Sequence, residues 1–213
     1  MERLRWTLAF CIVVLFLSFT SVPCQAQGQV LPGKISLRSQ KSYATSGSMK
    51  IFWNRVEGAQ GYEFRVTDLN GKVVGRRKVE GKVSATLTDL APGQFYRLRM
   101  RGYVRVDGKI QYGAASYTYI AQQPRVRFKW ASRSAVKVSW TGVAGAADYS
   151  IYISDNPSRG FERVKKVKDA QAVLVGLNRN WKYYVYVVAQ MRKGKRVYST
   201  PRTNQYTFRL QVG

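Results

Sequence analysis

Histidine is absent from this sequence, and cysteine is nearly so, because the only two cysteines, Cys11 and Cys24, lie close to the N-terminus. These two residue types supply most general bases, thiol nucleophiles and nitrogen or sulfur ligands of metal ions in proteins. Their absence from the rest of the chain excludes disulfide bonds there, together with the usual histidine- or thiolate-based active sites. We therefore predict a protein with no catalytic residues, no metal site and no cofactor.

Acidic residues are scarce as well, with 11 Asp and Glu against 36 Lys and Arg, which gives a formal net charge of +25 at pH 7. They are scattered singly and mostly in predicted turns, so the sequence shows no pair of carboxylates of the kind that cleaves glycosides. A Ser–Lys dyad is the one catalytic alternative that the residue types leave open. Such an excess of positive charge attracts polyanions, and its distribution over the surface decides where they bind.

Long apolar runs are absent apart from one, residues 6–19, which follows the short basic start MERLR. The small residues Cys24 and Ala26 then occupy the two positions that a signal peptidase reads. Together these features predict a signal peptide, residues 1–26, that is cleaved after Ala26. The run is shorter than the roughly 20 residues of a membrane-spanning helix, so an uncleaved anchor is a less favoured alternative. A lipoprotein cleaved before Cys24 is also less favoured, because Pro23 precedes the cysteine.

The predicted signal peptide determines the expected location of the mature chain. We expect it to have no transmembrane span and to be secreted, periplasmic or associated with the cell envelope. An exported chain of this size without disulfides fits a bacterial protein better than a small animal ectodomain.

The sustained spacing of an amphipathic helix is missing from the remaining chain, and one other pattern occurs twice in it. MKIFWNRVEGAQGYEFRV begins at Met49, and VKVSWTGVAGAADYSIYI begins at Val136. A constant offset of 87 residues relates the matching pairs Trp53 and Trp140, Tyr62 and Tyr149, Leu90 and Leu177, and Tyr96 and Tyr183. An offset that holds without a gap predicts one set of strands and loops built twice.

Each copy has the period-2 alternation of β-strands. Met49, Ile51 and Trp53 alternate with polar residues in one run, and the turn signals DLNGK, VEGK, APG and VDGK separate such runs in the first copy. About seven short strands with regular turns predict a sandwich of two sheets. At roughly 90 residues, each copy is large enough to have its own core.

Three features mark each copy: a tryptophan that ends the second strand, a tyrosine that begins the third, and a Leu-x-Pro-x-x-x-Tyr motif before the sixth. The last feature spans Leu90–Tyr96 in the first copy, while the second copy has Arg179 in place of the proline. In these features both copies resemble fibronectin type III domains. The resemblance implies an all-β protein of two seven-stranded immunoglobulin-like sandwiches in tandem, residues 29–122 and 123–213. It also implies a binding, spacing or adhesion module rather than an enzyme, although the fold does not identify a ligand.

The resemblance further implies that Tyr96 and Tyr183 are tyrosine-corner residues, whose hydroxyls bond back to the preceding loop. We expect the last strand of the first domain to end near Ile120 and the next strand to begin near Val126. Pro124 restricts the backbone between them. The two domains should therefore stand end to end as a semi-rigid pair.

The outward positions of the first domain are basic. If Leu98 and Met100 point into the core, the residues that alternate with them point to solvent. The third, sixth and seventh strands share one sheet in this family, so the third strand adds further outward residues. The predicted polyanion-binding residues are Arg65, Arg97, Arg99 and Arg101. Glu63 is the only acid that we place on this face, Tyr103 should also point outward, and an ordinary solvated surface is the alternative interpretation.

The same alternation makes the corresponding face of the second domain aromatic. Tyr184 and Tyr186 should point outward from the sixth strand, and Tyr152 should join them from the third. We expect these three tyrosines to form a flat platform that stacks on sugar rings or bases, or contacts another protein. Since strand propensity alone favours tyrosine at such positions, an ordinary surface is again the alternative.

These expectations combine into a non-catalytic, secreted or envelope-associated binding or adhesion module. Its partner would be an anionic polysaccharide or an envelope phosphate polymer, with extracellular DNA as a further candidate. One alternative is a structural adaptor or assembly subunit that binds another protein through its tyrosine-rich face. Another is an accessory domain of a separately encoded enzyme.

Overall fold

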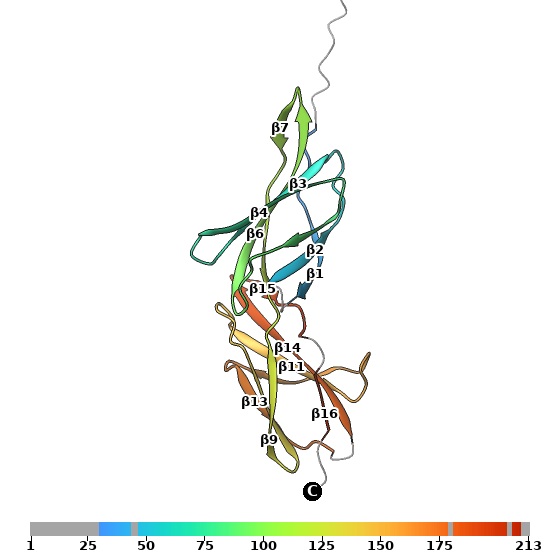
Figure 1. The fold of residues 1–213 in the computed structure, drawn as a ribbon, viewed down its shortest axis with the longest axis vertical. Helices are drawn as coiled ribbons and strands as arrows, with labels where there is room; N and C mark the ends of the chain where they lie inside the picture. Colours follow the sequence, from blue (N-terminus) through green and yellow to red (C-terminus); the bar gives the residue numbers. More distant parts are fainter. Residues whose placement is uncertain (1–29, 44–46, 179–180, 204–205, 210–213) are drawn as a thin grey trace, which may run out of the picture.

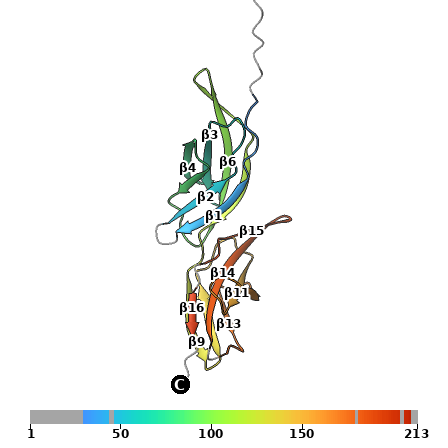
Figure 2. The same ribbon diagram turned by 90° about the vertical axis from the view of Figure 1, so that its right-hand side faces the viewer.

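The computed structural model describes residues 30–43, 47–178, 181–203 and 206–209, and these ranges contain strands but no helix. The predicted signal peptide and Arg179 lie outside the described residues. The strands form four sheets that make up two sandwiches, arranged end to end along the long axis of the molecule (Figure 1). Figure 2 shows the same arrangement from the side.

The first sandwich, which we call domain 1, pairs a sheet of three strands with a sheet of five. The smaller sheet has the order β1 (Leu37–Tyr43), β2 (Ser48–Trp53), β5 (Ser84–Leu87). The larger sheet has the order β4 (Val73–Glu80), β3 (Gly61–Thr67), β6 (Phe95–Val106), with β7 (Lys109–Tyr112) and β8 (Ser116–Ala121) both paired to β6.

The strands β7 and β8 together form the predicted seventh strand, which is interrupted at Gly113. A Cβ atom on Gly113 would lie 1.9 Å from the carbonyl oxygen of Pro32, so the N-terminal segment passes directly against the backbone at this point. The amide of Ala114 donates a hydrogen bond of 3.1 Å to that same oxygen instead of to β6. The sequence pattern did not show this break.

The second sandwich, domain 2, repeats the strand order of the first. Its smaller sheet has the order β9 (Val126–Ser132), β10 (Ala135–Trp140), β13 (Gln171–Leu174). Its larger sheet has the order β12 (Glu162–Val167), β11 (Asp148–Ser154), β14 (Lys182–Lys193), with β15 (Arg196–Ser199) and β16 (Tyr206–Arg209) both paired to β14. The predicted all-β architecture of two tandem sandwiches is therefore confirmed.

The repeat extends to individual core contacts. Trp53 packs against Tyr62 with ring centroids 5.2 Å apart, and Trp140 packs against Tyr149 at 5.3 Å. Each of these tyrosines accepts a hydrogen bond from the loop before its strand, from the amide of Val56 at 3.0 Å in domain 1 and from that of Val143 at 2.8 Å in domain 2. The repeated tryptophan and tyrosine thus make the same packing and hydrogen-bond contacts in both cores.

Both predicted tyrosine corners are present. The Tyr96 hydroxyl donates to the carbonyl oxygen of Ala91 at 3.4 Å, and the Tyr183 hydroxyl accepts from the amide of Asn178 at 2.8 Å. In each domain the hydrogen bond connects the start of the sixth strand to the loop five residues earlier. This bond fixes the register of that strand, and therefore the side of the sheet to which its other residues point.

Direct contacts join the two domains. The amide of Ala144 in domain 2 donates a hydrogen bond of 2.7 Å to the carbonyl oxygen of Gly93 in domain 1. The side chain of Phe95, also from domain 1, is fully buried in the hydrophobic core of domain 2. Tyr119 packs edge-on against Tyr198 at 4.9 Å. Gly93 has a φ of 80°, and a Cβ atom there would lie 2.9 Å from a backbone oxygen of domain 2, so only glycine fits without strain.

Candidate functional site

The predicted alternation along β6 is confirmed. Leu98 and Met100 are buried, whereas Arg97 is exposed and Arg99 and Arg101 are partly exposed on the outer face of the larger sheet. In the register between β3 and β6, Arg99 lies directly opposite Arg65, so the four predicted arginines share one face. We call the outer surface of β3, β4, β6 and β8 the arginine face.

One half of the arginine face is neutralised internally by Glu63. Its carboxylate lies 3.2 Å from Arg99 and 2.9 Å from Arg101, and it accepts a hydrogen bond of 2.8 Å from the Tyr112 hydroxyl. Burial alone would raise the pKa of Glu63, but the hydrogen bonds from Tyr112, Arg101 and Arg99 outweigh that effect and hold it below its usual value. Glu63 is therefore an anion at neutral pH, and its charge is paired with Arg101 and with part of the Arg99 guanidinium.

Arg101 is further fixed by Tyr112, because its guanidinium carbon lies 3.3 Å from the centroid of that ring. A guanidinium held between a carboxylate and an aromatic face has a structural role. Of the four predicted arginines, Arg101 is thus the one whose charge is already satisfied within the protein.

The other half of the face is not neutralised. Of the ion pairs within the described ranges, none involves Arg65 or Arg97. Arg65 lies between Arg76 and Arg99 across three adjacent strands, and its Nε atom is buried without a hydrogen-bond partner. Like charges in neighbouring strands repel one another, and a buried donor without an acceptor costs about 1–3 kcal/mol. The fold therefore retains an unfavourable group of cations on this half of the face.

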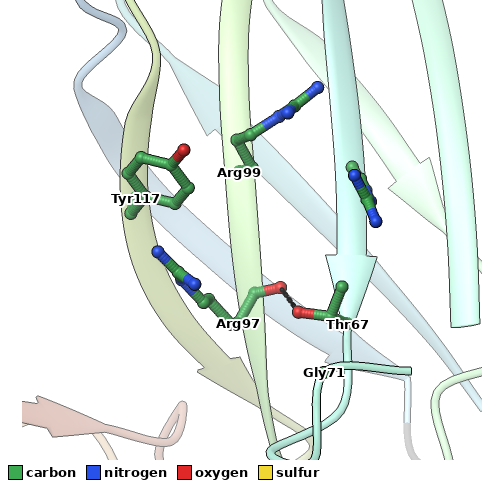
Figure 3. Close-up of a pocket in the computed structure, with 6 residues that line it drawn as sticks. Thr67, Gly71, Arg97, Arg99 and Tyr117 are labelled. Atoms are coloured by element: carbon green, nitrogen blue, oxygen red, sulfur yellow. Dashed lines mark hydrogen bonds between the residues drawn. The ribbon is translucent and has the colours of Figure 1, made fainter. Parts of the chain in front are cut away.

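A shallow pocket of about 200 Å³ lies on this half of the face (Figure 3). Tyr117 of β8 forms one wall, and the guanidinium carbon of Arg97 lies 4.3 Å from the centroid of its ring. Thr67 donates a long hydrogen bond of 3.5 Å to the carbonyl oxygen of Arg97 at the base (Figure 3). The residues that line the pocket are Arg65, Thr67, Gly71, Arg97, Arg99 and Tyr117.

Tyr103 and Glu80 differ from the sequence-based expectation. Tyr103 lies on the outer side of β6, but it is buried, because its ring covers Gly61 on the neighbouring strand. Its hydroxyl donates to Glu80 at 2.8 Å, and Glu80 also pairs with Arg105 at 2.8 Å. Burial and the contact with Glu80 raise the pKa of Tyr103 to about 12. Glu80 is therefore a second acid on this face, beside Glu63. Tyr103 lies on the expected side of the sheet, but its side chain is buried and not exposed to solvent.

In domain 2, the corresponding face brings Tyr152 and Tyr186 together. They lie directly opposite each other in the register of β11 and β14, and their rings stack at 4.7 Å with an interplanar angle of 16°. Phe161 packs against Tyr186 at 4.9 Å, and the guanidinium carbon of Arg202 lies 5.8 Å from the same ring. Neither neighbour could be predicted from the strand pattern, because both lie outside the alternating strand positions.

The tyrosines do not form the flat platform that we expected. Tyr152 and Tyr186 cover each other's faces, and burial together with Tyr152 raises the pKa of Tyr186. Tyr184 lies two residues along β14, where the ammonium of Lys182 is 5.4 Å from its ring centroid. The structure thus assembles two of the three tyrosines into a compact pair and leaves Tyr184 beside a cation.

The described residues include no group of three or more acidic, histidine or cysteine side chains that could hold a metal ion. Within the same ranges, no helix has the length and hydropathy that crossing a membrane requires.

Comparisons with known proteins add only distant similarity. No protein-family model matches the sequence, and no curated protein matches it significantly. Among the solved structures that do match is the two-domain fibronectin type III segment of chicken tenascin, with 14% sequence identity and a TM-score of 0.35. The match covers 84% of this chain and 98% of the tenascin segment. The strand order in the two sandwiches therefore carries the fold assignment by itself.

Proposed function

We propose that this chain of two fibronectin type III-like sandwiches is a non-catalytic, exported binding module that holds an anionic polymer on the arginine face of domain 1. The single observation that carries the proposal is the uncompensated half of that face. Arg65 and Arg97 have no acidic partner among the described residues, and both line a pocket together with Arg99. A bound anion would remove the repulsion between these cations.

The chemistry of arginine favours oxyanions as ligands. A guanidinium group is planar, remains charged at all physiological pH values, and presents paired donors that match carboxylate, sulfate or phosphate oxygens. The full sequence has a net charge of +25, and an exported protein this basic would meet such groups on anionic polysaccharides, on envelope phosphate polymers and on extracellular DNA. Binding of this kind weakens steeply with salt, because each neutralised charge on the polymer releases counterions.

Retention on immobilised heparin tests the proposal. The variant in which Arg65, Arg97 and Arg99 are all changed to Ser should elute at much lower salt than the wild type. A matched control changes Arg127, Lys129 and Lys137 to Ser, because these exposed residues on the smaller sheet of domain 2 remove the same charge from a different surface. The control should elute only slightly earlier than the wild type. Equal shifts for both variants in folded protein would show that binding depends on total charge and not on this face.

A second candidate function is an adaptor that binds another protein through the tyrosine cluster of domain 2. The observation that favours it is the partly exposed Tyr152–Tyr186 stack with Phe161 and Arg202 around it. Such a contact should persist at high salt, unlike binding to the arginine face. Light scattering of a mixture with envelope extract at low and high salt, repeated with Tyr152→Ser, separates the two functions. Association that disappears at high salt, or that the variant leaves intact, argues against the adaptor.

A further inference from the structure

We infer that the pocket between β3, β6 and β8 is a discrete site for one tetrahedral oxyanion, namely the terminal group of a sulfate or phosphate monoester carried by the polymer. This inference rests on the proposed function, since it specifies which group of the polymer the arginine face would hold. It differs from a diffuse attraction between a basic surface and a polyanion, because it requires a defined set of donors around one group.

The donors come from three sides of the pocket. Arg65 lies on β3, Arg97 and Arg99 lie on β6, and Tyr117 lies on β8. Arg65 forms no ion pair within the described ranges, so an anion in the pocket can bind its guanidinium group without displacing an acidic partner. Each guanidinium group has five N–H donors, and Arg99 uses only part of its set on Glu63.

Neighbouring residues hold these donors in place before any ligand arrives. The ring of Tyr117 lies beside the Arg97 guanidinium, and Glu63 holds Arg99 from the opposite end of the face. Glu63 itself is fixed by Arg101 and Tyr112, neither of which lines the pocket. A preorganised set of side chains loses less conformational entropy on binding than free arginine side chains would.

The size of the pocket limits what it can take. Its volume of about 200 Å³ is below the roughly 300–1,000 Å³ of sites that enclose drug-sized ligands, so it fits one charged group and its immediate attachment and not a long segment of the polymer.

The number of donors selects among anionic groups. Three guanidinium groups from two adjacent strands, β3 and β6, match the three free oxygens of a sulfate or phosphate monoester. A carboxylate or a phosphodiester has only two such oxygens, and one arginine fork already pairs with both of them. The site should therefore prefer monoesters to carboxylates and to the diester backbone of nucleic acids.

Small-anion titrations followed by NMR test this inference on the intact protein. The probes are methyl sulfate, methyl phosphate, dimethyl phosphate and acetate, each added at constant ionic strength against sodium chloride. We expect saturable shifts at the backbone amides of Thr67, Gly71 and Tyr117 with the two monoesters, and affinities at least about fivefold weaker for dimethyl phosphate and acetate. The stronger of the two monoesters indicates whether the natural group is a sulfate or a phosphate. Equal responses to all four probes, or no saturation at these amides, would overturn the inference.

Single substitutions sharpen the test within one face. Arg65→Ser and Arg97→Ser should each weaken monoester binding by about tenfold or more. Arg105→Ser is the matched control, because it removes the same charge from the same strand but from an exposed residue that pairs with Glu80 and does not line the pocket, and it should change the affinity by no more than about twofold. If Arg105→Ser weakens binding as much as Arg97→Ser, the site is a diffuse charge field and the inference is wrong. The NMR spectrum of each variant reports directly whether it is folded.

A pair of changes at Tyr117 separates the roles of its ring and its hydroxyl. Tyr117→Phe keeps the surface beside Arg97 and should retain most of the affinity, whereas Tyr117→Ala should lose about fivefold or more because Arg97 is no longer held. Equal affinity in the wild type and Tyr117→Ala would contradict the role assigned to the ring.

The two proposals can fail independently. If heparin retention depends on Arg65, Arg97 and Arg99 but the protein shows no selectivity for monoesters, the proposed function is supported and the inference of a discrete pocket is wrong. Selective monoester binding without heparin retention would establish the pocket and reject the polymer as its carrier.

Discussion

The outer faces of the two domains differ at positions that the repeat makes equivalent. Arg65 and Arg99, which oppose each other across β3 and β6, correspond through the 87-residue offset to Tyr152 and Tyr186, which oppose each other across β11 and β14. Two guanidinium groups repel at this cross-strand position, whereas two tyrosine rings stack at 4.7 Å. The same strand framework thus carries two cations in domain 1, of which only Arg99 has an acidic partner, and two tyrosine rings that stack on each other in domain 2.

This contrast indicates where specificity lies in such a repeat. The tryptophan, tyrosine and corner positions are the same in both cores, so they specify the fold and not the ligand. The outward residues of the third and sixth strands differ between the two domains, and the intrinsic strand preference of a side chain there changes stability by only about 1 kcal/mol. Function in each domain is therefore expected to follow these outward positions.

The largest effect is expected when domain 1 is given the pair of domain 2. Changing Arg65 and Arg99 together to Tyr should reduce affinity for a heparin oligosaccharide by roughly 100-fold, because two of the three pocket arginines are lost. Stability should change little, because the stacking pair that replaces the repulsive pair offsets the loss of the ion pair between Arg99 and Glu63. Calorimetric titration measures the first quantity and chemical denaturation the second. Lower stability with unchanged affinity would contradict the account of both faces.

The reverse exchange should mainly affect stability. Changing Tyr152 and Tyr186 together to Arg should lower the free energy of unfolding by about 1–2 kcal/mol, because the aromatic stack is lost and two cations are placed opposite each other. Methyl sulfate should restore part of the loss if the new pair binds an oxyanion. Urea denaturation with and without the anion measures both effects, and an unchanged midpoint would show that the stack contributes nothing.

Glu63 should give domain 1 a pH dependence that the corresponding position of domain 2, Ser150, cannot give. Because its folded pKa is lowered, its ion pairs stabilise the protein above the usual glutamate pKa, and this contribution is lost as the pH falls through the lowered value. Glu63→Gln should therefore cost about 1 kcal/mol at pH 7 and less at pH 3. Stability curves of both proteins over this range test the prediction, and parallel curves would contradict it.

The smallest effect is expected at Tyr103, for which domain 2 has Gln190 at the equivalent position. Since its folded pKa is about 12, the neutral hydroxyl is favoured in the folded state. Its stabilising effect is complete below the usual pKa of 10.0 and is lost as the pH rises towards 12. Spectrophotometric titration should show a late tyrosine ionisation near pH 12 that disappears in Tyr103→Phe. Ionisation of Tyr103 with the exposed tyrosines would contradict this assignment.

Much of the fold could be predicted from the sequence, because strand parity and the corner motif are local properties. Leu98 and Met100 had to lie on one side of β6 once Tyr96 was assigned to the corner, and the arginines then had to lie on the other. The repeated tryptophan and tyrosine positions carried the same prediction into domain 2. These assignments require no knowledge of which residues face one another across strands.

The details of the site depended on cross-strand register, which the sequence pattern does not specify. The partnership of Glu63 with Arg101, the burial of Tyr103 over Gly61 and the stacking of Tyr152 on Tyr186 all follow from which residues pair across two strands. The four arginines therefore looked equivalent in the sequence, although Arg101 is internally paired and Arg65 is not. Their different environments arise only when β3, β4 and β8 are placed around β6.

The most direct test of the central claim is the salt dependence of affinity for a sulfated oligosaccharide, measured by titration of the wild type and of Arg65→Ser/Arg97→Ser. The account predicts that the logarithm of the wild-type affinity falls with the logarithm of salt concentration with a slope of about −2 to −3, and that the double variant binds more weakly with a slope reduced by about 2. The same slope and affinity in both proteins would contradict the claim that the unpaired arginines of domain 1 form the binding site.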